Sequence, residues 1–298
     1  MKCKKCGRKA ITKLKQYGIA LCESCYPEFY KTLVEKSIKK FKIIKKGENV
    51  LAAVSGGKDS VAMISVLKEL SEDLGFKVEM LHIDLGIGDY SRKSRKVSEE
   101  LSSAIDVSLH VVELKQYGFT IDDVEVKKVC SVCGTSKRYI MNRFAREHGF
   151  DVVATGHTSE DIIVFFFKNW LSGNFQWSEK LLPRTESFDE KIVTRVRPLF
   201  DRGEKENMLY VLTSGLPYVE EECPHAPVDE WKEIVYDIEA RKPGFKRGFV
   251  LNLVKYLKTR DQKKDEEYGY CKKCGEVSIS DVCAFCKVVD KFGKEKGQ

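Results

Sequence analysis

The sequence predicts an α/β fold in which a parallel-sheet core is flanked by N- and C-terminal four-cysteine zinc fingers. Apolar stretches of strand length alternate with stretches of helical periodicity through residues 48–228, which is typical of a parallel sheet covered by helices. One strand runs into a pair of glycines immediately before a helix, at residues 49–60. Eight of the 11 cysteines form two sets of four near the termini.

Composition indicates one large domain with small attachments. The chain has 298 residues, of which 42% are hydrophobic, enough to build a core. Its net charge of +7 is compatible with a polyanionic partner. No apolar run is long enough to span a membrane, and the N-terminus lacks the apolar segment of a secretory signal. We therefore expect a cytoplasmic protein without a membrane partner, whose cysteines bind metals rather than form disulfides.

The two terminal cysteine sets share one arrangement, a pair of Cys-x-x-Cys motifs. Fifteen residues separate the motifs of the first set, and eight separate those of the second. Four thiolates at such spacings surround a tetrahedral zinc ion and leave no open position for catalysis. Disulfides or a redox role are the alternatives, but segments this small need a metal to fold. The predicted ligands are Cys3, Cys6, Cys22 and Cys25 for one zinc and Cys271, Cys274, Cys283 and Cys286 for the other.

Two cationic helical segments flank the core. A helix over 29–46 is amphipathic, with lysines crowding its polar face, which suits either solvent or an RNA backbone. Two further helices over 230–258 carry a second cationic face, which suits either phosphate binding or solvent. It is formed by Arg241, Lys242, Lys246, Arg247, Lys255 and Lys258. The predicted units are a zinc finger (1–27), a basic linker helix (28–47), the catalytic domain (48–228), a basic helical segment (229–265) and a second finger (266–298).

Residues 49–60 predict a strand, a tight turn and the start of a helix. Gly56 and Gly57 let the backbone approach an anion closely, and the free N–H groups of a helix N-terminus favour negative charge. The turn therefore suits a phosphate or pyrophosphate. It is not a Walker A loop, because Lys58 follows the glycine pair and precedes Asp59. An ordinary Gly-Gly turn is the alternative.

Strands and helices continue to alternate after this turn. The carboxyl ends of parallel strands meet at one edge of a sheet, so ligand-binding residues should gather there. Cations that open the helix at 91–105 oppose its dipole, and a bound phosphate would compensate them. Phe165, Phe166, Phe167 and Trp170 suggest core or a dimer face, and 172–192 suggest a flexible loop. The remaining strands are predicted over 78–84, 107–114, 151–155 and 195–200, and the remaining helices over 135–148, from 159 and over 204–214.

Three cysteines remain, namely Cys130, Cys133 and Cys223. Three thiols cannot close an all-thiolate zinc site. They could hold a four-iron cluster with one iron open, or bind zinc with His225 as fourth ligand. They could also run a persulfide or disulfide cycle between Cys133 and Cys223, or be buried and inert. Spacing alone does not choose among these four interpretations.

Residues 55–60, Ser-Gly-Gly-Lys-Asp-Ser, resemble the PP-loop of the adenylating ATP pyrophosphatases, which attach AMP to a carbonyl oxygen and release pyrophosphate. With the two fingers, nearly the whole chain resembles the tRNA 2-thiouridine synthetases of the TtuA type. The resemblance implies an adenine nucleotide alpha hydrolase-like core. It is carried further by Cys130-Ser131-Val132-Cys133, by Glu222-Cys223-Pro224-His225-Ala226-Pro227, and by residues 83–87, 156–161 and 197–199.

Site residues follow from this resemblance. It implies a [4Fe-4S] cluster on Cys130, Cys133 and Cys223, and catalytic roles for these cysteines and for Asp59, Lys137 and Asp161. A solvated lysine and a helix-capping aspartate are the alternatives for the last two. Glu160 departs from the family pattern Gly-His-Asn/Thr-x-Asp-Asp, which favours Asp161 over its neighbour. ATP, with Mg²⁺, is expected at Ala53, Val54, Ser55, Gly56, Gly57, Lys58, Asp59, Ser60, His82, Ile83, Asp84, Gly86, Gly156 and His157.

The reaction implied by the resemblance is ATP-dependent 2-thiolation of a tRNA uridine, with T-loop uridine 54 as the expected target. The implied partners are tRNA, a ubiquitin-like sulfur carrier with a C-terminal thiocarboxylate, and a second copy of the chain. A wobble-uridine or cytidine thiolase of the same superfamily is an alternative, as is a non-catalytic RNA-binding zinc-finger module. A PP-loop ligase that makes NAD or GMP would leave the cysteines unexplained.

Overall fold

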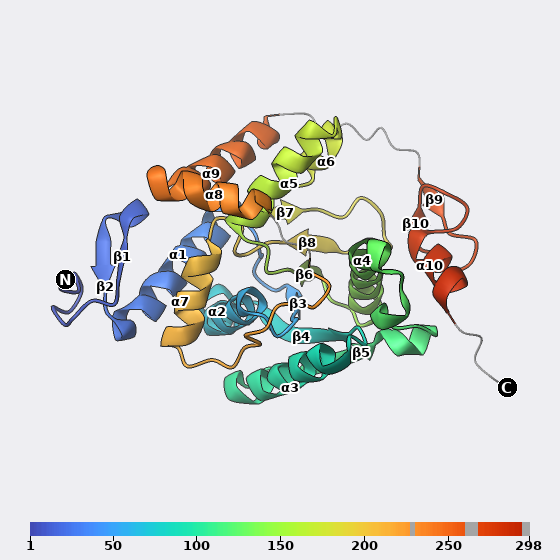
Figure 1. Ribbon diagram of the computed structural model, residues 1–298, viewed down its shortest axis with the longest axis horizontal. Coiled ribbons are helices and arrows are strands. Elements are labelled where there is room, and N and C mark those ends of the chain that lie inside the picture. The colour runs from blue at the N-terminus through green and yellow to red at the C-terminus, as the bar shows by residue number, and fades with distance from the viewer. Residues whose placement is uncertain (227–229, 260–267, 294–298) are drawn as a thin grey trace.

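A mostly parallel sheet lies at the centre of the computed structural model, which describes residues 1–226, 230–259 and 268–293 (Figure 1). Within these ranges the sheet has six strands in the order β5-β4-β3-β6-β8-β7, and only β7 runs antiparallel to its neighbour. The predicted α/β class is confirmed. The strands are β3 (Asn49–Ala53), β4 (Lys77–Asp84), β5 (Leu109–Glu113), β6 (Val152–Ala154), β7 (Arg184–Thr185) and β8 (Thr194–Val196).

Helices cover both faces of the sheet (Figure 1). Buried residues of α2, α3, α5 and α7 form one hydrophobic cluster with the strands, and α4 forms a second cluster on the opposite face. Among the described helices, none is long and apolar enough to cross a bilayer. The helices are α1 (Tyr26–Phe41), α2 (Lys58–Leu74), α3 (Gly88–Ile105), α4 (Val129–Glu147), α5 (Ser159–Leu171), α6 (Phe175–Glu179), α7 (Glu204–Thr213), α8 (Glu230–Arg241), α9 (Phe245–Lys258) and α10 (Ala284–Phe292).

Strand alternation explains the two clusters. Val50 and Ala52 of β3 belong to the cluster under α2, whereas Leu51 between them belongs to the cluster under α4. The neighbouring strand β6 follows in register, because Val153 is paired with Leu51 and lies in the same α4-side cluster. Both faces of the central strands are therefore buried, as expected for a parallel sheet.

The two four-cysteine units lie at opposite ends of the molecule (Figure 1). The first contains the antiparallel pair β1 (Thr12–Leu14) and β2 (Ile19–Leu21) and leads directly into α1. The second contains β9 (Gly269–Tyr270) and β10 (Val277–Ser278), and its helix α10 packs on α4. The predicted domain boundaries at 228/229 and 265/266 fall outside the described residues.

Four predicted elements differ from the structure. The basic helix, expected to reach residue 46, ends at Phe41. Lys42 follows in the left-handed conformation, and the chain turns there to bury Ile43. The helix expected over 135–148 begins at Val129, so Cys130 and Cys133 lie within α4 rather than before it. The strand expected over 195–200 stops at Val196, since Pro198 cannot donate to a sheet ladder. The loop expected over 172–192 contains α6 and β7.

The aromatic segment of α5 is part core and part surface. Phe166 and Phe167 pack against Phe249 of α9, with ring centroids 5.2 and 5.7 Å apart. Phe165 and Trp170 are each 46% exposed. Phe166 and Phe167 therefore belong to the core. An interface role stays a prediction for the exposed Phe165 and Trp170.

A buried ion network joins the N-terminal unit to α7. The Arg202 side chain is fully buried, 2.8 Å from Asp201 and 3.5 Å from Glu206. Its guanidinium also donates to the hydroxyl of Tyr17, at 2.6 Å. Ser37 of α1 donates to Asp201 at 2.9 Å. The network thus couples the first four-cysteine unit and α1 to the segment that opens α7.

We expect Arg202→Met to lower the free energy of unfolding by about 3–5 kcal/mol, because the substitution leaves two carboxylates buried without their cation. Urea denaturation followed by circular dichroism measures the loss. Arg95→Met is the matched control, since exposed Arg95 pairs with Glu99 at the surface and should cost less than about 1 kcal/mol. Equal losses in both variants would contradict a structural role for the network.

Candidate active site

The turn between β3 and α2 is shaped to receive an anion. Gly56 has φ +80°, and a Cβ there would lie 3.1 Å from the carbonyl oxygen of Ser94, so a side chain does not fit. The Ser60 hydroxyl accepts from the Ser55 amide at 3.1 Å and donates to the Gly57 carbonyl at 2.9 Å. No side chain caps α2, so the first amides of the helix are open to a ligand.

Five charged side chains form a chain of ion pairs beside this turn, the carboxylate network. Lys58 lies 3.0 Å from Asp59 and 2.9 Å from Glu204. Lys232 of α8 lies 2.5 Å from Glu204 and 2.9 Å from Asp161. The network therefore gathers three carboxylates and two ammonium groups from α2, α5, α7 and α8 at one edge of the sheet.

The two aspartates of the network differ in acidity. Burial raises the pKa of Asp59 to about 6, and Glu204 adds to the effect. Burial also works against ionisation of Asp161, but Lys232 and His157 outweigh it and leave the pKa of Asp161 below its ordinary value. The Asp161 carboxylate also accepts from the Thr158 amide at 2.9 Å, so it caps α5 as well as pairing with Lys232.

The turn after β6 packs directly on the start of α2. A Cβ on Gly156 would lie 3.1 Å from the backbone oxygen of Asp59. His157 hydrogen-bonds to the Thr155 hydroxyl at 2.8 Å, and burial, followed by the nearby Arg197, lowers its pKa to about 4. Glu160 is fully buried and pairs with Lys246 at 2.6 Å. Glu160 is thus committed to a structural pair, whereas Asp161 faces the network.

The carboxyl end of β4 supports the turn from the other side. The His82 ring is 2% exposed, with Nδ1 3.0 Å from the Val54 carbonyl and Nε2 without a partner among the described residues. Asp84 accepts from the Gly86 amide at 2.9 Å. Gly86 has φ +67°, and a Cβ there would lie 2.5 Å from the Thr120 methyl. Nucleotide binding by these residues stays a prediction.

The central cysteines come together from two segments. Cys130 and Cys133 lie in the first two turns of α4, and Cys223 lies in the segment after α7. Cys133 and Cys223 both lie near Tyr90, in the first turn of α3 just after the carboxyl end of β4. The Val219 amide, in the same segment as Cys223, donates to the Gly56 carbonyl at 2.9 Å. The thiols therefore lie at the same edge of the sheet as the anion-binding turn.

Electrostatic contacts link the central thiols to one another. Burial and the neighbouring thiols of Cys130 and Cys223 raise the pKa of Cys133, while Lys137 opposes the shift. Cys130 Sγ is 3.4 Å from the backbone oxygen of His225. The Nε2 atom of that histidine instead lies 3.3 Å from Asp122. Cys130, Cys133, Cys223 and Lys137 thus form one cluster. The Nε2 atom of His225 points to Asp122 and not to the thiols.

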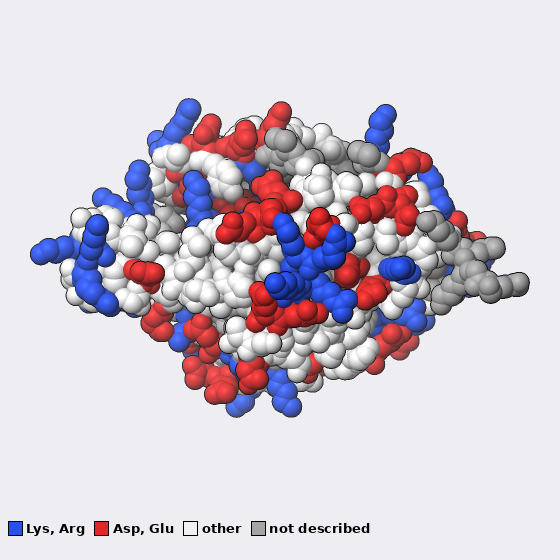
Figure 2. All heavy atoms as spheres, turned by 60° about the horizontal axis from the view of Figure 1, so that its bottom comes forward, with Lys and Arg blue, Asp and Glu red and all other residues white. Residues whose placement is uncertain are grey.

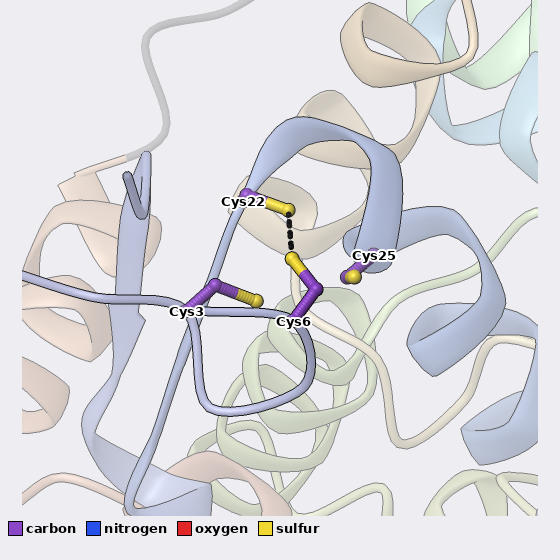
Figure 3. Close-up of side chains that lie close together, drawn as sticks. All are labelled: Cys3, Cys6, Cys22 and Cys25. Carbon is purple, nitrogen blue, oxygen red and sulfur yellow. Dashed lines mark hydrogen bonds between the residues drawn. The ribbon is translucent and has the colours of Figure 1, made fainter. Parts of the chain in front are cut away.

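The terminal cysteine sets have the spacing of mononuclear sites, and Figure 3 shows the N-terminal set. Within each set the ligand atoms all lie within 4.8 Å of one another. Cys6 and Cys22 have their sulfurs 3.5 Å apart, and Cys274 and Cys283 have theirs 3.7 Å apart. Tetrahedral zinc with Zn–S bonds of about 2.3 Å places sulfurs about 3.8 Å apart. In the described part of the chain the central cysteines do not form such a set.

The C-terminal unit docks on the helix that carries Cys130 and Cys133. Phe285 of α10 stacks on Tyr139 of α4, with ring centroids 3.9 Å apart. Arg146 forms a bidentate pair with Glu276, at 2.5 and 2.7 Å. The position of α4, and hence of its first turn, therefore depends on this unit.

Cations at the start of α3 are compensated by acidic side chains. Figure 2 shows Lys and Arg gathered on this face, with Asp and Glu around them. These acidic neighbours supply the compensation that the sequence suggested for a bound phosphate. The pairs are Arg92–Asp89, Lys93–Glu221, Arg95–Glu99, Arg95–Glu113 and Lys96–Glu100.

Several residues of the site lack a motif in the sequence. Glu204 resembles an ordinary acidic residue at a helix start, and Lys232 is one of many cations in a basic segment. Asn207 donates to Asp59 at 2.8 Å from one turn inside α7. A search for acidic and amide side chains at the starts of later helices could have suggested Glu204 and Asn207. Lys232 has no such signal.

The chain matches two family models. One, described as a PP-loop domain, covers residues 30–226. The other, described as the N-terminal LIM domain of 2-thiouridine synthetase TtuA, covers residues 2–27.

Relatives and a solved structure match along the whole chain. The tRNA-5-methyluridine(54) 2-sulfurtransferase of Pyrococcus horikoshii is 38% identical over 296 residues, which cover 96% of this chain and 93% of the relative. The protein of the same name from Thermotoga maritima is 35% identical over 311 residues and covers 100% and 99%. The U34-tRNA thiolase NcsA from Methanococcus maripaludis, solved with its [4Fe-4S] cluster, has a TM-score of 0.82 at 26% identity and covers 100% and 98%.

The opposite pKa shifts of Asp59 and His157 predict opposite pH dependences of stability. Folding raises the pKa of Asp59 from 3.8 to about 6, so its contribution to stability is lost as the pH rises through 6. Folding lowers the pKa of His157 from 6.5 to about 4, so its contribution is lost as the pH falls below 6.5.

From about pH 5 to about pH 6.5, the stability of Asp59→Asn relative to the unmodified protein should therefore rise by about 1 kcal/mol, and that of His157→Asn should fall by about 1–2 kcal/mol. Urea unfolding at three pH values measures both differences. Parallel pH profiles for the two variants and the unmodified protein would contradict the assignment.

Proposed function

The chain belongs to the PP-loop family of tRNA 2-sulfurtransferases, and we propose that it replaces the C2 oxygen of uridine 54 in tRNA with sulfur. One observation carries the proposal: the anion-binding turn before α2 and the three central thiols lie at the same edge of the sheet. Thiolation needs both, because phosphate must activate the carbon that sulfur then attacks. Position 54 is supported by full-length relatives named for that nucleotide.

In the proposed activation step, the α2 turn holds the pyrophosphate part of ATP. The open amides at the start of α2 and the Lys58 ammonium supply positive charge. The C2 oxygen of the uridine attacks the α-phosphorus, and the bond to pyrophosphate breaks with its electron pair leaving on pyrophosphate. Lys137, beside Cys133, is proposed to stabilise phosphate charge or to activate the acceptor base.

We propose that Mg²⁺ joins ATP at the carboxylate network. Asp161 and Glu204 offer hard oxygen donors of the kind Mg²⁺ prefers, and in the structure Lys232 bridges them. When bound, the ion would offset the charge of the phosphates. Asp161 is the more readily ionised donor because its pKa is lowered, whereas that of Asp59 is raised.

In the proposed sulfur step, a sulfur nucleophile adds to C2 and AMP leaves with the oxygen. Cys130, Cys133 and Cys223 fit a [4Fe-4S] cluster, because three thiols gather without the tight mutual spacing of the terminal sets. With three cysteine ligands, such a cluster would supply an iron that can bind the sulfur nucleophile. Of the residues that would hold the cluster, Cys133 lies beside Lys137, and Cys133 and Cys223 lie near Tyr90 just after the end of β4.

We further propose a structural zinc ion in each terminal set. The sulfur separations of 3.5 and 3.7 Å support this assignment, and four thiolates complete the coordination. Neither metal would take part in the reaction. The zinc ions would instead hold α1 and α4 in place.

Three partners complete the proposal, which places the protein in the cytoplasm. tRNA is the substrate of the family. A ubiquitin-like carrier with a C-terminal thiocarboxylate is proposed to deliver sulfur. A second copy of the chain is proposed to cover the aromatic patch of α5 and α6, where Phe165, Trp170, Phe175 and Trp177 are each about half exposed. A monomer mass in sedimentation at micromolar concentration would refute the homodimer.

Incubation of unmodified tRNA with the anaerobic protein, ATP and sulfide should exchange one oxygen for sulfur at nucleotide 54. Nuclease digestion and mass spectrometry locate the change. A transcript with cytidine at position 54 is the control and should stay unmodified. Sulfur at position 34 would instead favour the reaction named for the Methanococcus maripaludis protein, and no mass change would refute thiolation.

The two halves of the site should be separable by mutation. Asp59→Ala should lower pyrophosphate release by about 100-fold while iron content is unchanged, because it removes only the network beside the turn. Cys223→Ser should abolish iron binding while two zinc ions per chain and ATP binding are retained. Metal analysis and a pyrophosphate assay measure these outcomes, and loss of both functions in either variant would indicate a purely structural defect.

A further inference from the structure

Three arginines, the arginine row, line the space between α4 and β8. Arg138 lies on α4 beside Cys133, and Arg195 and Arg197 follow one another along β8 and beyond its end. Arg197 is close to His157 in turn. The arginine row therefore runs from the central thiols to the turn that precedes Asp161. We propose that it binds a backbone phosphate of tRNA next to the uridine that is modified, an inference that rests on the proposed thiolation of tRNA.

Strand and helix geometry places the row. The Val193 amide donates to the Asn142 side chain at 2.9 Å, which fixes the start of β8 against α4. Two residues along a strand advance by about 6.7 Å, and four residues along a helix by about 6 Å. Arg195 lies two residues after Val193, and Arg138 lies four residues before Asn142, both toward the carboxyl edge of the sheet. Arg195 therefore lies at the same height as Arg138.

Arg195 points to the α4 side of the sheet. It is paired in register with Val153 of β6, whose side chain belongs to the α4-side cluster. Its neighbours Thr194 and Val196 are buried and point to the opposite face. Arg197 lies two residues after Arg195 and therefore points to the same, α4 side of the sheet. It lies at the carboxyl edge, where ligands of parallel sheets bind.

Among the described residues the row has no carboxylate partner, and the charged group of opposite sign beside it is the Cys133 thiol, next to Arg138. Neither Arg138 nor Arg195 forms a hydrogen bond or an ion pair with another described residue. Arg197 donates only to neutral oxygens, the Leu182 carbonyl at 2.6 Å and the Thr185 hydroxyl at 3.2 Å. Other arginines of the core are paired, for example Arg184 with Glu48 at 2.8 Å. An unpaired row is unusual for partly buried cations.

Burial and mutual repulsion lower the pKa of two arginines of the row. Burial, followed by the charge of Arg138, lowers the pKa of Arg195, and burial, followed by Arg195, lowers the pKa of Arg197 to about 10. An anion placed between the guanidinium groups would reverse both effects. Phosphate is the best match, because a guanidinium donates two parallel hydrogen bonds to two of its oxygens.

The position of the row favours an RNA phosphate over a phosphate of ATP. The turn that holds the ATP phosphates follows β3, and the predicted adenosine pocket is beyond it at β4. The row lies on the other side of β3, at β8, with β6 between them. The modified uridine must lie between the carboxylate network and the central thiols, because both act on it. The arginine row extends from one of these places to the other. A phosphate that flanks the uridine would therefore meet the row.

The test measures tRNA and ATP binding by Arg195→Gln in the full-length protein. At low salt we expect the affinity for tRNA to fall about tenfold, and the slope of log K against log salt concentration to decrease by about 1, because one phosphate contact is lost. The affinity for ATP without tRNA should be unchanged. Arg195→Lys, which keeps the charge but not the paired donors, should give an intermediate loss. Lys77→Gln is the control, since Lys77 is exposed at the opposite edge of the sheet and should change neither affinity.

Thermal unfolding separates binding from structure. Without ligand, Arg195→Gln should unfold at the same temperature as the unmodified protein or higher, because it removes repulsion within the row. A lower unfolding temperature with unchanged tRNA affinity would overturn the proposal in favour of a structural role. Loss of ATP affinity instead of tRNA affinity would overturn it in favour of the nucleotide as the source of the phosphate. If the unmodified protein thiolates tRNA and Arg195→Gln binds it normally, only this inference fails and the proposed function stands.

Discussion

Close packing of backbone turns at the carboxyl edge of the sheet is the constraint on which the site depends. Gly56 lies against the backbone of α3, and Gly156 lies against the backbone at the start of α2, at separations that leave no room for a side chain. These contacts bring the end of β6 beside the first turn of α2. Asp161 consequently reaches the same ion network as Asp59, although 101 residues separate them in the chain.

Each four-cysteine unit supports one half of this edge. The N-terminal unit leads into α1, and the buried ion network around Arg202 joins both to α7, which supplies Glu204 and Asn207. The C-terminal unit stacks Phe285 on Tyr139 and pairs Glu276 with Arg146, and so holds α4 and its cysteines. A small metal unit cannot build a core of its own, but a folded one can position a neighbouring helix.

Charge pairing divides the cations of the protein into two groups. The cations of α3 lie beside acidic partners at the surface, and Lys58, Lys232 and Lys246 are paired with carboxylates inside the site. The arginine row differs, because its charges face one another. Net charge alone, at +7, would not have distinguished these cations. The presence or absence of an acidic partner shows that an anionic ligand would stabilise the arginine row more than the other cations.

The sequence by itself determined the fold class, the anion-binding turn and the two terminal four-cysteine sets. Each of these is local, since a strand, two glycines and a helix, or two Cys-x-x-Cys motifs, are visible within about 30 residues. Local pattern also misplaced Cys130 and Cys133, because the buried face of α4 extends the helix over both.

Only the tertiary structure decided which distant residues complete the site. Lys232, Glu204 and Asn207 lie in helices without a motif, and the partners of Arg195 and Arg138 depend on the register of β8 against α4. Ion pairs and unpaired charges are properties of side chains from separate elements, and no periodicity in the sequence records them. The anion-binding turn could therefore be read from the chain, whereas the charges that surround it could be read only from the packing of five helices against one edge of the sheet.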